Sequence, residues 1–193
     1  MEMGQRVTVN RENEMERIVS EFGEKLLRYA TSILYNHQDA EDAVQDVFLN
    51  YFQNSHRFDV KNVSAWLYKM TYNNCLDKRK MKSRRKLSFL EDVGEEPAVH
   101  MEDNLAITEL MKALEPLKPQ ERALLYGRAV NEQSYEELSR IMGVSPSALR
   151  KQYERVKKKA IKLLDAQEHG YGESIVKPKE MPDTAKGVGY CEI

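Results

Sequence analysis

Residues 39–49 read DAEDAVQDVFL, residues 62–77 read NVSAWLYKMTYNNCLD, and residues 78–86 read KRKMKSRRK. The first segment has apolar residues at helical spacing and its acidic residues largely on another face, which predicts an amphipathic helix. The second is an aromatic-rich helix that runs directly into the third, in which seven of nine residues are basic. Helices are the only element type indicated before Lys86. The sequence therefore predicts a small helical bundle with an acidic surface and a basic one.

The composition is that of small helical domains with much surface. Of 193 residues, 41% are hydrophobic and 32% are charged, so the chain can form one large domain or two small ones. The net charge is −1, but the charges are sorted into blocks, which indicates local nucleic-acid binding. No apolar run approaches the ~20 residues that span a bilayer, and the N-terminus lacks a signal-peptide apolar region. Cys75 and Cys191 lie far apart, which argues against a disulfide framework, so we expect a cytoplasmic protein without membrane insertion.

Apolar periodicity predicts three helices in the N-terminal part. The first covers about residues 11–35 and has one buried face. Asn36-His37-Gln38 then breaks the pattern, and Asp39 is the expected N-cap of the second helix. The apolar stripe of the second helix consists of Val44, Val47, Phe48, Tyr51 and Phe52. The third opens at Asn62 or Ser64 and is expected to bury Trp66, Leu67 and Met70.

A helix-turn-helix pattern lies in residues 134–156. Ser134 and Glu137 have capping-box spacing, and Gly143 stands where a helix would end in the left-handed conformation. Ser145 can cap the next helix, with Pro146 at its first position. The shared core of the two helices is expected to consist of Leu138, Ile141, Val144, Leu149, Tyr153 and Val156. Two helices joined by a short glycine-containing turn form a DNA-binding motif.

Helical periodicity stops between the two halves. Residues 91–97 read EDVGEEP and contain little that is apolar, which indicates a flexible acidic linker and a domain boundary. We therefore expect an all-α fold of two small domains: a helical bundle over residues 11–86, a linker over 87–103, and a four-helix domain with the helix-turn-helix over 104–168. Residues 169–193, which contain several glycines and prolines, are expected to form a disordered tail.

The helix that starts at Pro146 is strongly basic. Its first turns would enter the major groove, where arginine grips a guanine edge and glutamine an adenine edge. The candidates for reading bases are Ser147, Arg150, Lys151 and Gln152, while Arg155 and Lys158 are candidates for phosphate contact. The alternative is a solvated basic face on a bundle helix.

The basic segment 78–86 follows aromatic residues that could stack on bases. Single-stranded nucleic acid binds where aromatic rings lie beside cations. The candidates for contact are Tyr68, Lys69, Tyr72 and Asn73, whereas Trp66 is expected in the core. The alternative is a charged helix end in solvent.

The carboxylates of Glu41, Asp42 and Asp46 raise the question of a metal site or a general acid–base pair. No histidine or cysteine stands at ligand spacing nearby, since His37 and His56 are isolated. The chain also lacks a glycine-rich phosphate loop and a nucleophile motif. We therefore expect no enzymatic activity, no metal and no cofactor, and we interpret the carboxylates as a solvated or protein-docking face.

These segments together resemble a known family. Residues 39–48, residues 66–70 with Asn73 and Asp77, residues 117–122 (LKPQER) and the helix-turn-helix are similar to motifs of RNA polymerase sigma factors. The order and spacing are those of the extracytoplasmic-function (ECF) subfamily of the sigma-70 family. The resemblance covers about residues 15–86 and 104–164. Tyr72, where the family often has arginine, and Val156, where it usually has alanine, depart from the pattern.

The resemblance implies a factor that joins bacterial core RNA polymerase and recognises the −10 and −35 elements of promoter DNA. Contacts with the β′ clamp of the polymerase are implied for Asp39, Glu41, Asp42, Gln45, Asp46 and Phe48. Contacts with the −10 element are implied for Arg57, Phe58, Lys61, Asn62, Tyr68, Lys69, Asn73 and Arg79. Contacts with the −35 element are implied for Ser147, Arg150, Lys151, Gln152 and Arg155. The resemblance also implies that the C-terminal domain packs on the polymerase β flap, and that a cognate anti-sigma factor binds the chain.

Two other classes of protein fit parts of the sequence. An ordinary helix-turn-helix repressor would bind duplex DNA as a dimer without polymerase, whereas the acidic first domain predicts dependence on core enzyme. A regulatory adaptor such as an anti-sigma protein would bind no specific DNA. The chain lacks the membrane span or zinc-type His/Cys spacing that many such adaptors use.

Overall fold

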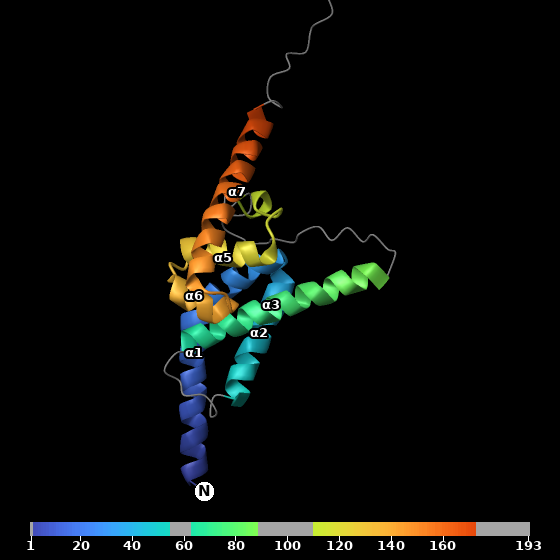
Figure 1. Cartoon of the computed structure of the whole chain (residues 1–193). Coiled ribbons are helices and arrows are strands. Elements are labelled where there is room, and N and C mark those ends of the chain that lie inside the picture. The colour runs from blue at the N-terminus through green and yellow to red at the C-terminus, as the bar shows by residue number, and fades with distance from the viewer. Residues whose placement is uncertain (1, 55–62, 89–109, 173–193) are drawn as a thin grey trace, which may run out of the picture.

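Three long helices form the N-terminal half of the protein (Figure 1). The computed structural model describes residues 2–54, 63–88 and 110–172. The long helices are α1 (Glu2–Leu34), α2 (His37–Asn54) and α3 (Val63–Ser88). The C-terminal half contains a helical turn at residues 110–113, followed by α5 (Pro119–Ala129), α6 (Tyr135–Met142) and α7 (Pro146–Gly172). Every regular element in these ranges is a helix, which confirms the all-α prediction.

The turn between α1 and α2 is capped by a different residue from the one expected. Tyr35 adopts a left-handed φ of 62° and ends α1. The Asn36 side-chain oxygen then accepts a hydrogen bond from the Asp39 backbone N–H at 2.9 Å. The predicted N-cap at Asp39 is therefore wrong: Asn36 caps the helix, and Asp39 lies in its acidic first turn, where its charge opposes the positive end of the helix dipole.

One apolar core joins α1, α2 and α3. Leu26, Tyr29, Ile33, Val47 and Leu67 are fully buried at its centre. Four members of the predicted α2 stripe are buried, but the fifth, Phe52, is 42% exposed, so this part of the prediction is wrong. A straight helix keeps only about three positions per two turns on its buried face. Phe52, near the end of α2, lies outside this face.

The basic segment does not leave the helix. Residues 78–86 are part of α3, which continues unbroken to Ser88 and projects away from the bundle (Figure 1). The basic half of α3 is therefore a continuous helical extension beyond the bundle.

The helix-turn-helix forms as its local residues predict. The Glu137 carboxylate accepts hydrogen bonds from the backbone N–H and the hydroxyl of Ser134, at 2.7 and 2.8 Å. Gly143 ends α6 with a φ of 69°. Leu124, Leu138 and Leu149 form the core between α5, α6 and α7. Gly127 allows this close packing, since a Cβ there would lie 2.8 Å from the Leu138 side chain.

The last helix is longer than the predicted domain. Leu117, Val156 and Ala160 form a second small core beneath α7. The helix extends to Gly172, four residues into the range expected to be a tail. The predicted linker 87–103 lies outside the described residues except for its first two, which end α3, and so do residues 173–193.

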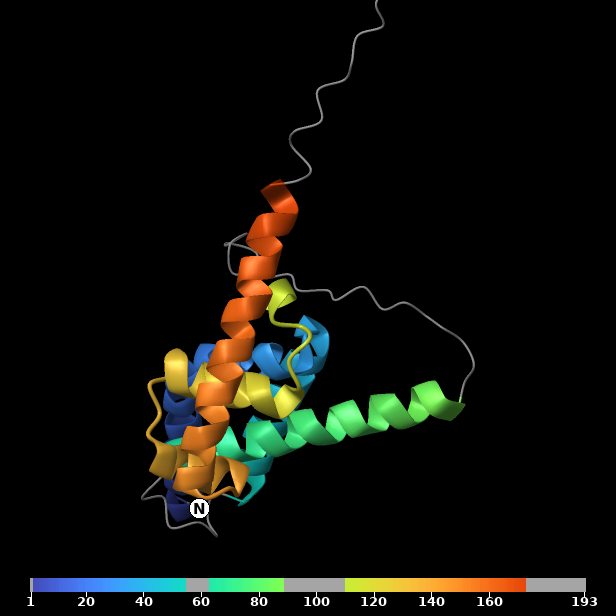
Figure 2. The same ribbon diagram turned by 45° about the horizontal axis from the view of Figure 1, so that its top comes forward.

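The two halves pack against each other. Helix α5 lies against α1, and α6 lies against α3 (Figures 1 and 2). Ile141 of α6 belongs to the core of the N-terminal helices. The assignment of Ile141 to the helix-turn-helix core is therefore wrong, because α6 is buried on two sides and turns Leu138 toward its own domain and Ile141 toward α3.

Candidate polymerase and nucleic-acid interfaces

The acidic face of α2 is open to solvent. Glu41, Asp42, Gln45 and Asp46 are exposed, and Asp39 is half-buried. Phe48, predicted in the same set, is 9% exposed and packs in the core below this face. The helix thus presents three exposed carboxylates over about one and a half turns.

Lysines of α3 lie against the acidic face. The Lys82 ammonium is 2.5 Å from the Asp39 carboxylate, and the Lys78 ammonium is 3.6 Å from that of Asp42. These contacts were not predicted from the sequence, because they depend on how α2 and α3 cross. The Lys82–Asp39 pair is half-buried, whereas the Asp42 carboxylate is 58% exposed. Ion pairs at the surface contribute only ~0–1 kcal/mol, so Asp42 can exchange its partner at low cost.

The face of α3 predicted to contact DNA is divided. Lys69, Asn73 and Arg79 are exposed, whereas Tyr68 is only 5% exposed. The Tyr68 ring meets the Tyr29 ring edge to face, with centroids 5.3 Å apart. Burial raises the pKa of the Tyr68 hydroxyl to about 12. Arg57, Phe58, Lys61 and Asn62 lie outside the described residues.

The predicted recognition surface of α7 is open. Ser147, Arg150, Lys151 and Arg155 are exposed, and Gln152 is half-buried. The Arg150 guanidinium lies over the Tyr135 ring, 5.1 Å from its centroid, and Arg128 lies 5.4 Å from the same centroid. Tyr135 was not predicted from the sequence as a neighbour of Arg150. Its position as the first residue of α6, beside a basic recognition helix, was the available signal.

Arg122 is a buried cation that bridges the two halves. Its Nε donates to the Ser32 carbonyl at 2.9 Å, and its Nη2 donates to the Ile33 carbonyl at 2.6 Å. Its Nη1 donates to the carbonyls of Glu115 and Leu117 at 2.9 and 2.6 Å. Burial lowers the pKa of Arg122 to about 10, which still leaves the guanidinium charged at neutral pH.

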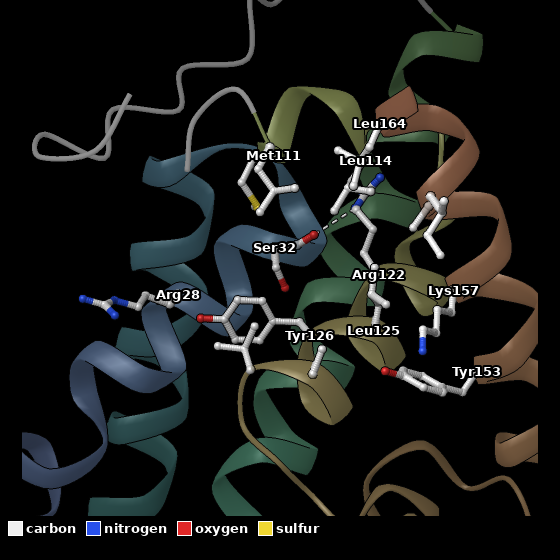
Figure 3. Close-up of a pocket in the computed structure, with 15 residues that line it drawn as sticks. Arg28, Ser32, Met111, Leu114, Arg122, Leu125, Tyr126, Tyr153, Lys157 and Leu164 are labelled. Atoms are coloured by element: carbon white, nitrogen blue, oxygen red, sulfur yellow. Dashed lines mark hydrogen bonds between the residues drawn. The ribbon is translucent and has the colours of Figure 1, made fainter. Parts of the chain in front are cut away.

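An apolar groove of about 440 Å³ lies beside Arg122 (Figure 3). Helix α1 contributes Arg28 and Ser32 to its wall, and α5 contributes Leu125 and Tyr126. The same groove is lined by three large apolar residues that are 44–59% exposed: Leu110, Val130 and Ile161. Both domains therefore form this groove.

Two absences can be stated for the described parts of the chain. Within residues 2–54, 63–88 and 110–172, no three His, Cys, Asp or Glu side chains are grouped so as to hold a metal ion. None of the helices described there has the length and apolarity needed to cross a membrane.

Comparison with known families decides the identity of the fold. The model of sigma-70 region 2 matches residues 18–85, and that of sigma-70 region 4 matches residues 107–159. The chain belongs to the sigma-70 family. Members of this family are non-enzymatic subunits of RNA polymerase that direct the start of transcription. Region 2 thus corresponds to α1–α3, and region 4 ends within α7.

Curated relatives of this sigma-70 family chain belong to the ECF subfamily. It is 26% identical over 149 residues to the ECF RNA polymerase sigma factor SigE of Mycolicibacterium smegmatis, covering 72% of this chain and 57% of SigE. The chain therefore spans little more than half the length of SigE. It is 27% identical over 144 residues to the ECF RNA polymerase sigma factor SigM of Mycobacterium tuberculosis, covering 72% of this chain and 71% of SigM.

Two solved structures share the fold. The sigma factor RpoE from Bartonella quintana, in complex with the anti-sigma factor NepR, matches with a TM-score of 0.66 and 23% identity, over 79% of this chain and 97% of RpoE. CnrH, in complex with the cytosolic domain of CnrY, matches with a TM-score of 0.62 and 22% identity, over 80% of this chain and 90% of CnrH.

Proposed function

We propose that this chain binds bacterial core RNA polymerase and directs it to promoters as an ECF-type sigma factor in the cytoplasm. The observation that carries the proposal is that both regions of the family occur in order on one chain. Each presents an exposed charged surface: the carboxylates on α2 and the cations on α7.

The acidic face of α2 is the proposed polymerase-docking site. Asp42 and Asp46 are exposed one helical turn apart, and Asp39 and Glu41 extend the same charged surface. Charge complementarity steers association and selects partners more than it adds affinity. A basic surface on the β′ clamp is the partner that this face fits, and we propose that Gln45 joins the contact. Phe48 supports the helix from the core side.

Promoter contact is proposed for two separate helices. Arg150 and its neighbours at the start of α7 are exposed where a recognition helix reads base edges at the −35 element. Lys69, Asn73 and Arg79 on α3 are proposed to contact the −10 element. Each of these DNA-binding surfaces is expected to bind weakly alone. Once the polymerase fixes their separation, binding of one raises the effective concentration of the other at its element, so the chain as a whole binds the promoter more tightly. Bases captured from the opened strand offset a few kcal/mol of unstacking, so no ATP is needed.

Run-off transcription tests this function. Purified core polymerase and the full chain are supplied with promoter fragments cloned from start sites mapped after forced expression. We expect one product of defined length that requires both proteins. Tight binding of the chain alone to those fragments, with no product, would instead identify a repressor.

We also propose that an anti-sigma factor occupies the groove between the two domains. Of the two proteins that share this fold, RpoE was solved with the anti-sigma factor NepR bound and CnrH with the cytosolic domain of CnrY bound. The groove is apolar, and Arg28 and Lys157 lie in its lining, which fits an amphipathic helix with an acidic edge. The docking contact would involve Val130 and Ile161, both exposed.

The inhibitor is sought by co-purification from the native cell and is then added back to run-off transcription. Inhibition of the wild-type chain, together with activity that persists when the chain carries Ile161→Glu, would support the groove as its site. Met81→Glu, at an exposed apolar residue of α3 outside the groove, is the matched control and should remain inhibited. Equal inhibition of the wild type and Ile161→Glu would place the inhibitor elsewhere.

A further inference from the structure

Arg150 is held against an aromatic ring that belongs to another helix. Its guanidinium carbon lies 5.1 Å from the centroid of the Tyr135 ring. Tyr135 is the first residue of α6, whereas Arg150 lies near the start of α7, so this contact joins the two helices of the helix-turn-helix. Within the part of the chain that the structure describes, no carboxylate forms an ion pair with Arg150. The ring contact is therefore what orients this exposed side chain.

The Tyr135 ring is itself fixed in place. It meets the Tyr153 ring edge to face, with centroids 6.3 Å apart, and it packs against the apolar core between α5, α6 and α7. The capping box of Ser134 and Glu137 sets the residue at which α6 begins, and thus where the ring emerges. A half-buried ring held by its own domain can serve as a stable support for a side chain that lies over it.

A ring is a suitable support for an arginine that reads a base. Contact with the face of a ring engages none of the guanidinium N–H donors in a hydrogen bond. These donors therefore remain available for the O6 and N7 atoms of a guanine. A carboxylate partner would occupy the same donors and would have to be displaced before the base could bind. The Tyr135 ring thus orients Arg150 without competing with DNA.

Arg155, the other arginine of the predicted −35 set, is held differently. Its Nε donates to the carbonyl of Lys151, one turn earlier on α7, at 3.4 Å. Among the described residues, no aromatic ring lies over Arg155. Of these two arginines, Arg150 is the one whose position is set by a residue outside its own helix.

We propose that Tyr135 is a positioning residue, which holds Arg150 ready to read one base of the −35 element and so determines specificity at that position. The inference rests on the proposed function, because it requires that α7 reads this element. Ordering a flexible side chain opposes binding, and the ring orders Arg150 before DNA arrives. Incorrect bases do not use the Arg150 contact. Loss of the ring should therefore weaken binding to the correct base more than binding to the others.

Nuclear magnetic resonance of the free full-length chain tests the contact without DNA or polymerase. Ring currents shift protons that lie over an aromatic ring upfield. The side-chain protons of Arg150, assigned by their loss in Arg150→Ala, should be shifted upfield in the wild type and in Tyr135→Phe. They should return downfield in Tyr135→Leu and Tyr135→Met, which remove the ring but keep an apolar side chain. Unchanged Arg150 shifts in these two variants would overturn the proposal.

Competition binding of the holoenzyme to promoter fragments, with each −35 position varied in turn, tests the effect on specificity. We expect Tyr135→Leu and Tyr135→Met to lower the preference for the base read by Arg150 by roughly two- to tenfold, with other positions unchanged. Tyr135→Phe should behave like the wild type. Arg128→Gln is the matched control, because it removes a second guanidinium from the same ring and should leave this preference unchanged.

A double-mutant cycle separates positioning from general support of the fold. In the Arg150→Ala background, Tyr135→Leu should change the preference at that base no further. The same additional loss in that background as in the wild type would overturn the positioning role. An equal loss at every −35 position would also overturn it, because Tyr135 would then only stabilise the domain. A wild-type holoenzyme without any base preference at −35 would refute the proposed function and leave the resonance result valid.

Discussion

At the scale of single residues, the capping box at the start of α6 couples the helix-turn-helix to pH. Hydrogen bonds from the Ser134 backbone N–H and then its hydroxyl lower the pKa of the Glu137 carboxyl below its usual value of 4.5. A carboxyl whose pKa is lower in the folded state stabilises the fold above the unfolded pKa, and this contribution is lost as pH falls through the folded pKa.

We predict that the free energy of unfolding decreases as pH drops below about 4.5, and that Glu137→Gln removes part of this dependence. Chemical denaturation at a series of pH values measures it. Ser134→Ala should cost about 1 kcal/mol at neutral pH, because it removes the cap. A Glu137→Gln variant with the full wild-type slope below pH 4.5 would contradict this assignment.

Arg150 is the residue on which the proposed reading of the −35 element depends most. It is exposed at the start of α7, and the Tyr135 ring lies beside its guanidinium. We predict that Arg150→Ala costs ~1–3 kcal/mol at one base position and relaxes specificity there. Competition binding of holoenzyme to promoter variants measures it. Lys162→Ala, further along the same helix, is the control, and a uniform loss on all sequences for Arg150→Ala would mean that it contacts phosphate only.

Residue roles were predictable where one helix face decides them. The alternation of apolar and charged residues placed Val44 and Val47 in the core and left Asp42 and Asp46 exposed. The burial of Tyr68 could not be foreseen in this way, because it depends on Tyr29 and Tyr126, which are far from Tyr68 in sequence. Periodicity describes a face but does not say which partner covers it.

At the scale of elements, the charge of α2, the proposed docking helix, is partly balanced by α3. Lys78 and Lys82 reach Asp42 and Asp39 across the crossing of the two helices. A basic polymerase surface would compete with these lysines for the same carboxylates. The affinity of docking is therefore expected to fall at high salt, since salt screens exposed charges.

We predict that Asp42→Lys weakens binding to core polymerase while duplex binding by α7 stays unchanged. The substitution reverses a charge that is 58% exposed, so it should have little effect on folding. Glu21→Lys on α1, with the same change of charge at an exposed position, should bind polymerase like the wild type. Equal affinity of Asp42→Lys and the wild type, measured by fluorescence anisotropy, would refute the docking assignment.

Elements defined by local signals were predictable, and their ends were less so. The Ser134 cap, the left-handed Gly143 and Pro146 place the helix-turn-helix within a residue of its prediction. The start of α2 was misplaced because Asn36 and Asp39 are equally good caps and only the geometry of Tyr35 selects between them. The basic end of α3 stayed helical because lysine and arginine have high helix propensity.

At the scale of the whole molecule, the two halves are joined by contacts that no local pattern reveals. Arg122 lies within LKPQER, a segment whose only signal in the sequence is its resemblance to the family. Its hydrogen bonds to Ser32 and Ile33 span about ninety residues of chain. Charge and periodicity predicted two domains, but they carried no information on how the domains pack, because that depends on a tertiary arrangement of carbonyl groups.

For the whole molecule, we propose that polymerase separates two DNA-contacting helices of one chain and places them on two promoter elements. A repressor with the same helix-turn-helix would need only one of these helices and no polymerase. A polymerase-dependent factor and a repressor differ in which DNA segments they protect, and in whether protection requires polymerase.

A nuclease footprint on a mapped promoter, with the chain alone, core polymerase alone and both together, tests this claim most directly. We predict protection of both the −35 and −10 elements, with permanganate-reactive thymines near −10, only when both proteins are present. Protection of a single duplex site by the chain alone, unchanged when polymerase is added, would contradict the claim.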